Sequence, residues 1–431
     1  MSAAGEEMAC QTCLAPLNTL GMPPTYVHPA HLDTDGHHPV PVPVSQLHTI
    51  RRSCDFCGDP YPIWTLRGGD VTAIAISAGS SLVQDFGHTW AACAACHTHL
   101  DDGRHDLVID RAVRTLGLGD HPQVRERITE LHRAFLDSRS PGRTLITTTS
   151  WPATTLTPGE LPKIRDRLAH FYRGEDHLPA TLGITQARDE IAAGLDRSHL
   201  YWIDTDFTDL AEHAASQLPD IPIGRDLPPA TDGMIIWSRP VTHQNITAAS
   251  WTDTGDGRQL ILYRTIGAGL DGKALQRLRE HVGWLAPTDA AHLPEQHPIT
   301  GGHPAAALVA TWLLIAQKAA DIGPARIDKT IVKTYARTNR RPPEVRIVRV
   351  RGRRPTPTHD GRTTPGGEGG TQDSRFWVSG HWRNQPHGPR RALRRPVYIN
   401  PFLRGPDDAP IRLSTTVRML SSRQPTSENR G

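Results

Sequence analysis

The feature that most constrains this chain is the placement of its cysteines. All six fall into three pairs with the same two-residue spacer: Cys10 and Cys13, Cys54 and Cys57, and Cys93 and Cys96. Such a spacer allows both thiolates of a pair to bind one metal ion. Disulfides or redox-active pairs are the alternative, but the acidic first residues show no secretory signal that would lead to an oxidising compartment. We therefore predict zinc (Zn²⁺) as the cofactor and a cytoplasmic location.

The second and third pairs are expected to share one ion, bound by Cys54, Cys57, Cys93 and Cys96. Gly58 permits the tight turn of a zinc knuckle, and the third pair precedes a helical pattern whose N-terminal dipole would stabilise thiolates. Four thiolates close a tetrahedral site, so this metal would be structural. Residues 51–137 are therefore predicted to form a zinc-ribbon or treble-clef-like region with following helices. His97 and His99 could compete as ligands or could lie on the surface of the same helix.

The first pair needs histidines if it binds its own ion. Cys10 and Cys13 could form a Cys₂His₂ site with His28 and His37, and two further histidines nearby, His31 and His38, could substitute. The alternatives are a pair that binds nothing and a pair that exchanges into the other site.

Charge is distributed unevenly along the chain. Residues 326–404 contain 19 Lys and Arg against 5 Asp and Glu, a net charge of +14, whereas the first 325 residues carry −12. A basic segment of this density is typical of a protein that binds a polyanion, most often nucleic acid. Two alternatives stay open: a solvated basic face without a partner, and a basic segment docked on the acidic part of the same chain.

Within this basic segment, one stretch holds many side chains suited to RNA or single-stranded DNA. Aromatic rings can stack on unpaired bases, and arginines can bind phosphates. The predicted contacts are Trp377, His381, Trp382, Arg383, Arg390, Arg391, Arg394 and Arg395. The alternative is that both tryptophans fill a small β core and the arginines only keep it in solution.

Composition divides the chain into five parts. They are a Cys/His-rich part at 1–50, the zinc-ribbon region at 51–137, a linker at 138–157, an α+β middle domain at 158–325, and a basic β-rich region at 326–431 with a disordered loop at 352–373. Apolar periodicity predicts helices over 107–116, 124–136, 158–172, 186–195, 208–218, 274–284 and 304–320, and strands over 234–237, 248–252, 259–264, 345–351, 375–382, 396–402 and 411–419. Because strands and helices do not alternate regularly, we expect an α+β fold without a parallel sheet, ending in a small antiparallel β unit.

Known enzyme motifs are absent from the sequence. It has no Gly-x-Ser-x-Gly, Walker loop, dinucleotide fingerprint or His-Glu-x-x-His. His381, Arg383 and His387 could act as acid, base and phosphate clamp in RNA cleavage, and Asp204 with Asp206 could hold a metal, but both sets are isolated. We expect binding rather than catalysis. The longest apolar run, 305–316, is shorter than the roughly 20 residues that span a bilayer, so no membrane partner is expected.

Several segments resemble uncharacterised proteins of actinobacteria and their phages. They are Cys-Asp-Phe-Cys at 54–57, Trp-Ala-Ala-Cys-Ala-Ala-Cys at 90–96, Trp-Leu-Leu at 312–314, Gly-His-Trp-Arg-Asn-Gln at 380–385 and Pro-Val-Tyr-Ile-Asn-Pro at 396–401. The segment at 380–385 is also similar to a family of phage inhibitors of type V-A CRISPR systems. That resemblance implies a role directed at RNA or translation; it does not reach the zinc region and transfers no catalytic residues.

Three functions are compatible with these patterns. The first is a nucleic-acid-binding protein of a phage or mobile element, with structural zinc and a basic C-terminal surface. The second is an RNA-directed inhibitor or ribonuclease-like anti-defence protein. The third is a scaffold for a protein partner, in which zinc only stabilises the fold.

Overall fold

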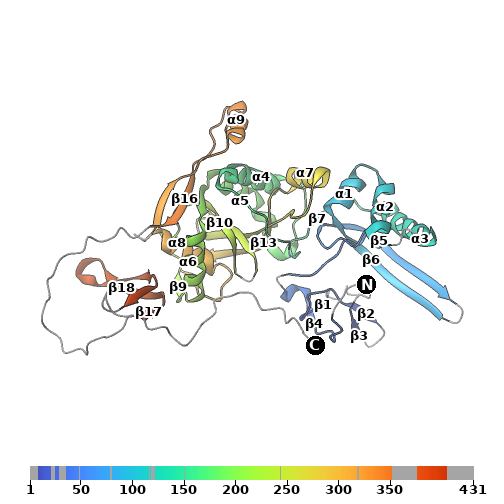
Figure 1. The fold of residues 1–431 in the computed structure, drawn as a ribbon, viewed down its shortest axis with the longest axis horizontal. Coiled ribbons are helices and arrows are strands. Elements are labelled where there is room, and N and C mark those ends of the chain that lie inside the picture. The colour runs from blue at the N-terminus through green and yellow to red at the C-terminus, as the bar shows by residue number, and fades with distance from the viewer. Residues whose placement is uncertain are drawn as a thin grey trace.

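A computed structural model describes residues 8–20, 25–28, 35–47, 49–77, 80–115, 117, 122–149, 151–242, 244–317, 320–351 and 376–404. Figure 1 shows a central sheet with its helices, a cysteine-containing region at one side and a small β hairpin at the other. The loop predicted at 352–373 and the strand predicted at 411–419 lie outside the described residues. None of the helices in the described ranges has the length and apolar character needed to cross a bilayer.

The N-terminal part forms two short antiparallel ladders. Strand β1 (Met8–Cys10) pairs with β4 (Pro41–Pro43), and β2 (Asn18–Leu20) pairs with β3 (Thr25–Val27). One 3₁₀ turn, η1 (Val44–Gln46), follows β4. The β1–β4 ladder pairs residues that are more than thirty positions apart in the chain, such as Cys10 and Pro41.

A long hairpin and three helices form the second region. Its elements are β5 (Pro62–Ser77), β6 (Ser80–Cys93), α1 (Ala94–Asp101), α2 (His105–Thr115), α3 (Pro122–Asp137) and β7 (Thr144–Leu145). Helices α2 and α3 confirm the two helices predicted after the cysteines. Phe135 of α3 stacks on Trp90 of β6, with ring centroids 4.4 Å apart, and both rings are buried.

The segment 138–157 is packed rather than a free linker. Its strand β7 pairs with β5, and Leu145 and Trp151 are buried in the same core as the cysteines. A Ser/Thr/Pro-rich composition favours irregular backbone, but it does not prevent a few apolar side chains from packing on a neighbouring strand.

The middle of the chain forms a seven-stranded mixed sheet in the order β13-β12-β11-β10-β8-β16-β15. The strands are β8 (His199–Ile203), β10 (Gly233–Val241), β11 (Ile246–Asp253), β12 (Gly257–Thr265), β13 (Leu285–Pro294), β15 (Ala320–Pro324) and β16 (Val345–Val350). The helices are α4 (Leu161–Arg173), α5 (Arg188–Arg197), α6 (Thr205–Ser216), α7 (Gly272–His281), α8 (Ala306–Ile315) and α9 (Lys329–Arg337). Short elements complete it: η2 (Pro158–Glu160), η3 (Ala180–Leu182), η4 (Thr185–Ala187), β9 (Ile221–Pro222) and β14 (Pro298–Ile299).

Successive side chains of an inner strand point to opposite faces of the sheet, and they pack into two cores, one on each face. In β8, Leu200 and Trp202 join the core that contains α4 and α5, whereas Tyr201 and Ile203 join the core that contains α6 and α8. Both faces are covered, so β11 and β12 are buried along almost their whole length, and every residue of α8 is buried. This layering accounts for the apolar character of the predicted strands and of the 305–316 run.

The expectation of no parallel pairing is wrong. Strand β8 runs parallel to both its neighbours, β10 and β16, and α6 forms the crossover from β8 to β10. The sequence analysis missed β8 because it is only five residues long and occurs in a single strand–helix–strand unit. Strand β16, assigned above to the basic C-terminal region, is an inner strand of this sheet, so the C-terminal β unit begins only at β17.

The C-terminal unit is antiparallel, as predicted. Strand β17 (Phe376–Val378) pairs with β20 (Phe402–Arg404), and β18 (His381–His387) pairs with β19 (Leu393–Ile399) across the turn η5 (Pro389–Arg391). The indole Nε1 of Trp382 donates a hydrogen bond to the carbonyl of Ala214 in α6, at 2.8 Å. The Trp382 ring also meets the buried Tyr398 ring edge to face. These contacts attach the β18–β19 hairpin to α6.

The packing of α5 on β11 makes a prediction about Gly194. A Cβ at this position would lie 2.1 Å from Oγ1 of Thr252. Helix propensity alone would make Gly194→Ala stabilising by up to about 1 kcal/mol, but the overlap should make it destabilising by roughly 1–3 kcal/mol. Urea unfolding followed by circular dichroism measures the sign. Ala193→Gly, its neighbour on the same helix, is the control and should lose about 1 kcal/mol from propensity alone.

Candidate metal centres

Four cysteine sulfurs meet in the core of the second region. Cys54 and Cys57 come from the knuckle before β5, and Cys93 and Cys96 come from the junction of β6 and α1; all four are buried, and the thiols are free. Their ligand atoms lie within 4.8 Å of one another. The sulfurs of Cys57 and Cys93 are 3.8 Å apart, which is the separation of about 3.8 Å expected for two thiolates 2.3 Å from a common tetrahedral ion.

Local backbone geometry orients these thiols. The carbonyl of Cys54 accepts hydrogen bonds from the N–H groups of Cys57 and Gly58, and Gly58 has φ +78°, a conformation that favours glycine. Cys93 is the N-cap of α1, and its sulfur accepts from the N–H of Cys96. The sulfur of Cys54 accepts from the N–H of Cys93 at 3.3 Å. The turn and the helix start predicted from the sequence are therefore both present. The N–H groups of Cys93 and Cys96 point at sulfur, whereas those of Cys57 and Gly58 close the turn on the carbonyl of Cys54.

The cluster differs in pKa from one sulfur to the next, and a cation lies beside it. Hydrogen bonds from the other cysteine thiols lower the pKa of Cys57, whereas burial raises that of Cys54. Burial opposes the charge of Arg111, but the nearby thiols of Cys93 and Cys57 raise its pKa, so its guanidinium is a permanent cation beside the site. Arg111 is held there by Asp59, 2.6 Å away. This ion pair joins α2 to the knuckle, and sequence spacing gave no signal for it.

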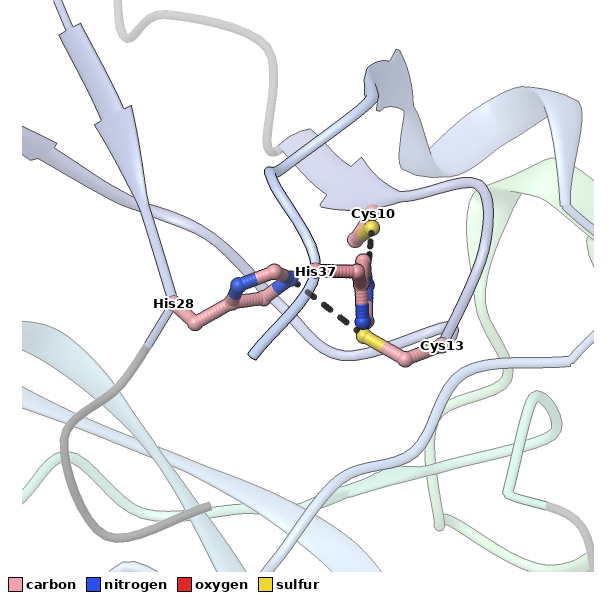
Figure 2. Close-up of side chains that lie close together, drawn as sticks. All are labelled: Cys10, Cys13, His28 and His37. Atoms are coloured by element: carbon pink, nitrogen blue, oxygen red, sulfur yellow. Dashed lines mark hydrogen bonds between the residues drawn. The ribbon is translucent and has the colours of Figure 1, made fainter. Parts of the chain in front are cut away.

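The second cluster lies in the N-terminal part and joins Cys10, Cys13, His28 and His37 (Figure 2). The sulfur of Cys10 is 3.3 Å from Nε2 of His37, and the sulfur of Cys13 is 3.4 Å from Nε2 of His28. A sulfur and a nitrogen bound to one tetrahedral zinc ion are about 3.5 Å apart. Of the four candidate histidines, the structure thus places His28 and His37 beside the two cysteines. His38 is exposed, and His31 lies outside the described part of the chain.

This second cluster is more accessible than the first. Cys10 is buried, whereas the other three side chains are partly exposed. Burial raises the pKa of Cys10, but hydrogen bonds from the N–H of Val40 and of Cys13 and from both histidines outweigh it and lower that pKa to about 5. Cys10 is therefore poised to ligate a cation at neutral pH.

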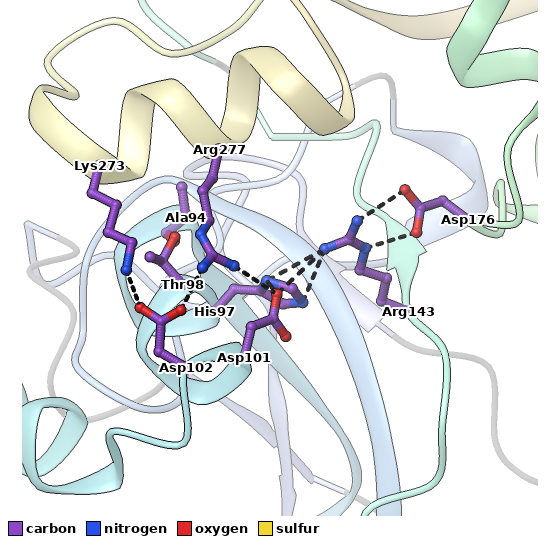
Figure 3. Close-up of polar contacts among 9 residues, drawn as sticks. All are labelled: Ala94, His97, Thr98, Asp101, Asp102, Arg143, Asp176, Lys273 and Arg277. Carbon is purple, nitrogen blue, oxygen red and sulfur yellow. Dashed lines mark hydrogen bonds and ion pairs between the residues drawn. The ribbon is translucent and has the colours of Figure 1, made fainter.

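Helix α1 contains the buried Cys96, has Cys93 as its N-cap, and also contacts the middle of the chain (Figure 3). Asp102, at its C-terminal end, forms ion pairs with Lys273 and Arg277 of α7. His97 is buried rather than on the surface: it lies 3.1 Å from Asp101 and beside Arg143. Burial lowers the pKa of His97, although Asp101 opposes this. The ring is not among the clustered ligands, and because it is buried its role is in packing.

Apart from Trp377, which belongs to β17, the predicted nucleic-acid contacts gather on the β18–β19 hairpin. His381 and Arg383 lie on β18, and Arg395 faces Gln385 across the ladder, so these cations share one face of the hairpin. Arg390 and Arg391 occupy the turn with left-handed backbone angles. The remaining cation, Arg394, is also exposed, as are the others.

The two tryptophans differ. Trp382 packs against α6, which is the alternative role considered for it, so its ring is not a free stacking surface. The side chain of Trp377 lies outside the described part of the chain. Asp204, considered above as a metal ligand, caps α6 by accepting from the N–H of Phe207, and it lies 3.8 Å from Arg349. Asp204 and Asp206 belong to neither of the two clusters found among the described residues.

Comparison of the chain with protein-family models, curated proteins and solved structures finds no match. The resemblance to phage and actinobacterial proteins therefore stays a prediction, and the function has to be argued from the geometry.

The two clusters should respond differently to loss of a ligand. The cluster of four cysteines shares one core with α4, α5 and β13. Cys57→Ser should therefore lower the stability of most of the chain, by several kcal/mol. Cys13→Ser should release only the N-terminal ladders. Thermal unfolding with limited proteolysis measures both. Equal losses in the two variants, or a local loss in Cys57→Ser, would contradict this assignment.

Proposed function

We propose that this protein is a zinc-containing nucleic-acid-binding protein, with two structural zinc sites and a basic surface for RNA or single-stranded DNA on the β18–β19 hairpin. The observation that carries the zinc part is the convergence of eight predicted ligands into two sets of four. Thiolate and imidazole donors in a tetrahedral arrangement suit zinc. Neither set leaves an open position, which suits a structural ion rather than a catalytic one.

The nucleic-acid part is supported by the exposed arginines of the hairpin. Arg383, Arg390, Arg391, Arg394 and Arg395 form no ion pair with a carboxylate among the described residues. Unpaired guanidinium groups on a short, anchored hairpin are suited to bind phosphates. Since Trp382 is used for packing, stacking on bases is assigned to Trp377. The phage or mobile-element origin, and a cytoplasmic location, remain part of the proposal.

Metal content tests the first part of the proposal. Protein purified without chelator should contain close to two zinc ions per chain, and Cys57→Ser and Cys13→Ser should each remove one. A chelator should extract the ion at Cys13 first, because that site is the more exposed. Elemental analysis that finds less than half an ion in the unmodified chain would reject structural zinc.

Salt dependence tests the second part. Binding of a fluorescent single-stranded RNA should weaken with salt, with a log–log slope steeper than about −2, because each phosphate contact contributes about 0.7. Arg394→Ala with Arg395→Ala should flatten this slope by about 1.4. Arg127→Ala with Arg133→Ala, which removes two exposed charges from α3, is the control and should not change it. If the full chain binds no nucleic acid at low salt, the protein-scaffold function replaces this one.

A further inference from the structure

Helix α9 presents a second basic surface, separate from the hairpin. Helix α9 follows β15 and precedes β16 in the chain, and Figure 1 shows it projecting from the sheet beyond β16, away from β18. Residues 329–341 contain five Lys and Arg and no Asp or Glu. Lys329, Lys333 and Arg337 are spaced four residues apart, so they lie along one side of the helix, and all three are exposed. These charges belong to the basic segment 326–404, and only the fold places them on one side of a helix.

The opposite side of α9 is anchored. Ile331 and Tyr335, also four residues apart, are buried. The hydroxyl of Tyr335 donates to a carboxylate oxygen of Asp166 in α4, at 2.6 Å. Arg340, just after the helix, lies 3.7 Å from the same carboxylate. The helix is therefore held in one orientation, and its basic side cannot turn toward the core.

The basic side has no partner within the described residues. Lys329, Lys333, Arg337 and Arg341 form no ion pair or side-chain hydrogen bond there. With a rise of 1.5 Å per residue, the first three charges are about 6 Å apart along the axis and span about 12 Å. One strand of a duplex places three to four phosphates in that length, at about 3.4 Å each.

We propose that α9 binds the phosphate backbone of a double-stranded nucleic acid through Lys329, Lys333 and Arg337; this inference rests on the proposed nucleic-acid function and extends it to a second surface. A duplex is favoured over a single strand because the exposed side of α9 offers charges and no aromatic ring. Its one aromatic residue, Tyr335, is buried. Such a surface contacts phosphates and not bases, and a duplex presents phosphates at the higher density.

An anionic membrane is the competing partner, and the helix does not suit it. A helix that lies on a membrane inserts a free apolar side into the headgroup region. The apolar side of α9 is already buried at Ile331 and Tyr335, and the Tyr335 hydroxyl bonds to α4; Val332 is the single large apolar side chain of α9 that is exposed. Charge complementarity without a free apolar side points to nucleic acid.

The experiment uses the full chain and a random-sequence duplex of about 20 base pairs, with affinity measured by fluorescence anisotropy over a salt series. Lys333→Ala with Arg337→Ala should flatten the log–log slope by about 1.8, since each duplex phosphate contact contributes about 0.9. Affinity at low salt should fall about tenfold. Lys333→Arg with Arg337→Lys retains the charges and should retain the slope. The α3 pair, Arg127→Ala with Arg133→Ala, is the matched control for loss of two exposed charges.

Two outcomes would overturn the inference. One is duplex binding with the same slope in the α9 and α3 variants; the other is an α9 variant that loses binding to anionic vesicles and keeps its duplex affinity. The proposed function is judged separately by the single-stranded RNA titration of the hairpin variants. If that titration succeeds and the α9 variant is unchanged on duplex, only the α9 inference fails. If the unmodified chain binds neither nucleic acid, both fail.

Discussion

The convergence of four cysteine sulfurs at the start of α1 is the constraint on which the N-terminal half depends. The hairpin of β5 and β6 has only a two-residue third strand, and such a ribbon is marginally stable by itself. Ligation of one ion by the knuckle and by α1 would join its two ends with a free energy on the order of 10 kcal/mol. The same helix then forms ion pairs with α7 through Asp102, so an ion bound by these cysteines would also support the contact between the two regions.

The two metal clusters serve the fold on different scales. The Cys₄ cluster is continuous with an apolar core that extends to Leu161, Ile191 and Leu285. The Cys₂His₂ cluster instead closes a small loop of short ladders around Cys10 and His37. Burial of all four thiols in the first cluster shields it from solvent, whereas three partly exposed side chains leave the second open to solvent. The Cys₄ cluster therefore belongs to the core, and the Cys₂His₂ cluster belongs to the small N-terminal ladders.

The β18–β19 hairpin and α9, the two basic elements, are attached to the rest of the protein in the same way. Each is attached by one aromatic side chain whose polar atom forms a hydrogen bond with the body of the protein: Trp382 with the carbonyl of Ala214, and Tyr335 with Asp166. An aromatic anchor buries a large apolar area and fixes direction through its N–H or O–H group. The arginines and lysines opposite these anchors are then left in solvent. Positive charge is thereby presented to solvent on two projecting elements.

The sequence by itself determined the features that depend on neighbouring residues. The Cys-x-x-Cys spacing, the turn at Gly58 and the helix after Cys93 follow from local backbone geometry, and the apolar periodicity of α2, α3 and β10–β12 follows from one-sided or two-sided burial. The tertiary structure decided what depends on distant partners. The parallel pairing of β8 with β16 joins residues about 145 positions apart, and no local pattern encodes it. The selection of His28 and His37, the packing role of Trp382 and the basic side of α9 were likewise decided by which surfaces the folded chain covers, because a charge or a ring becomes a binding group only where packing leaves it exposed.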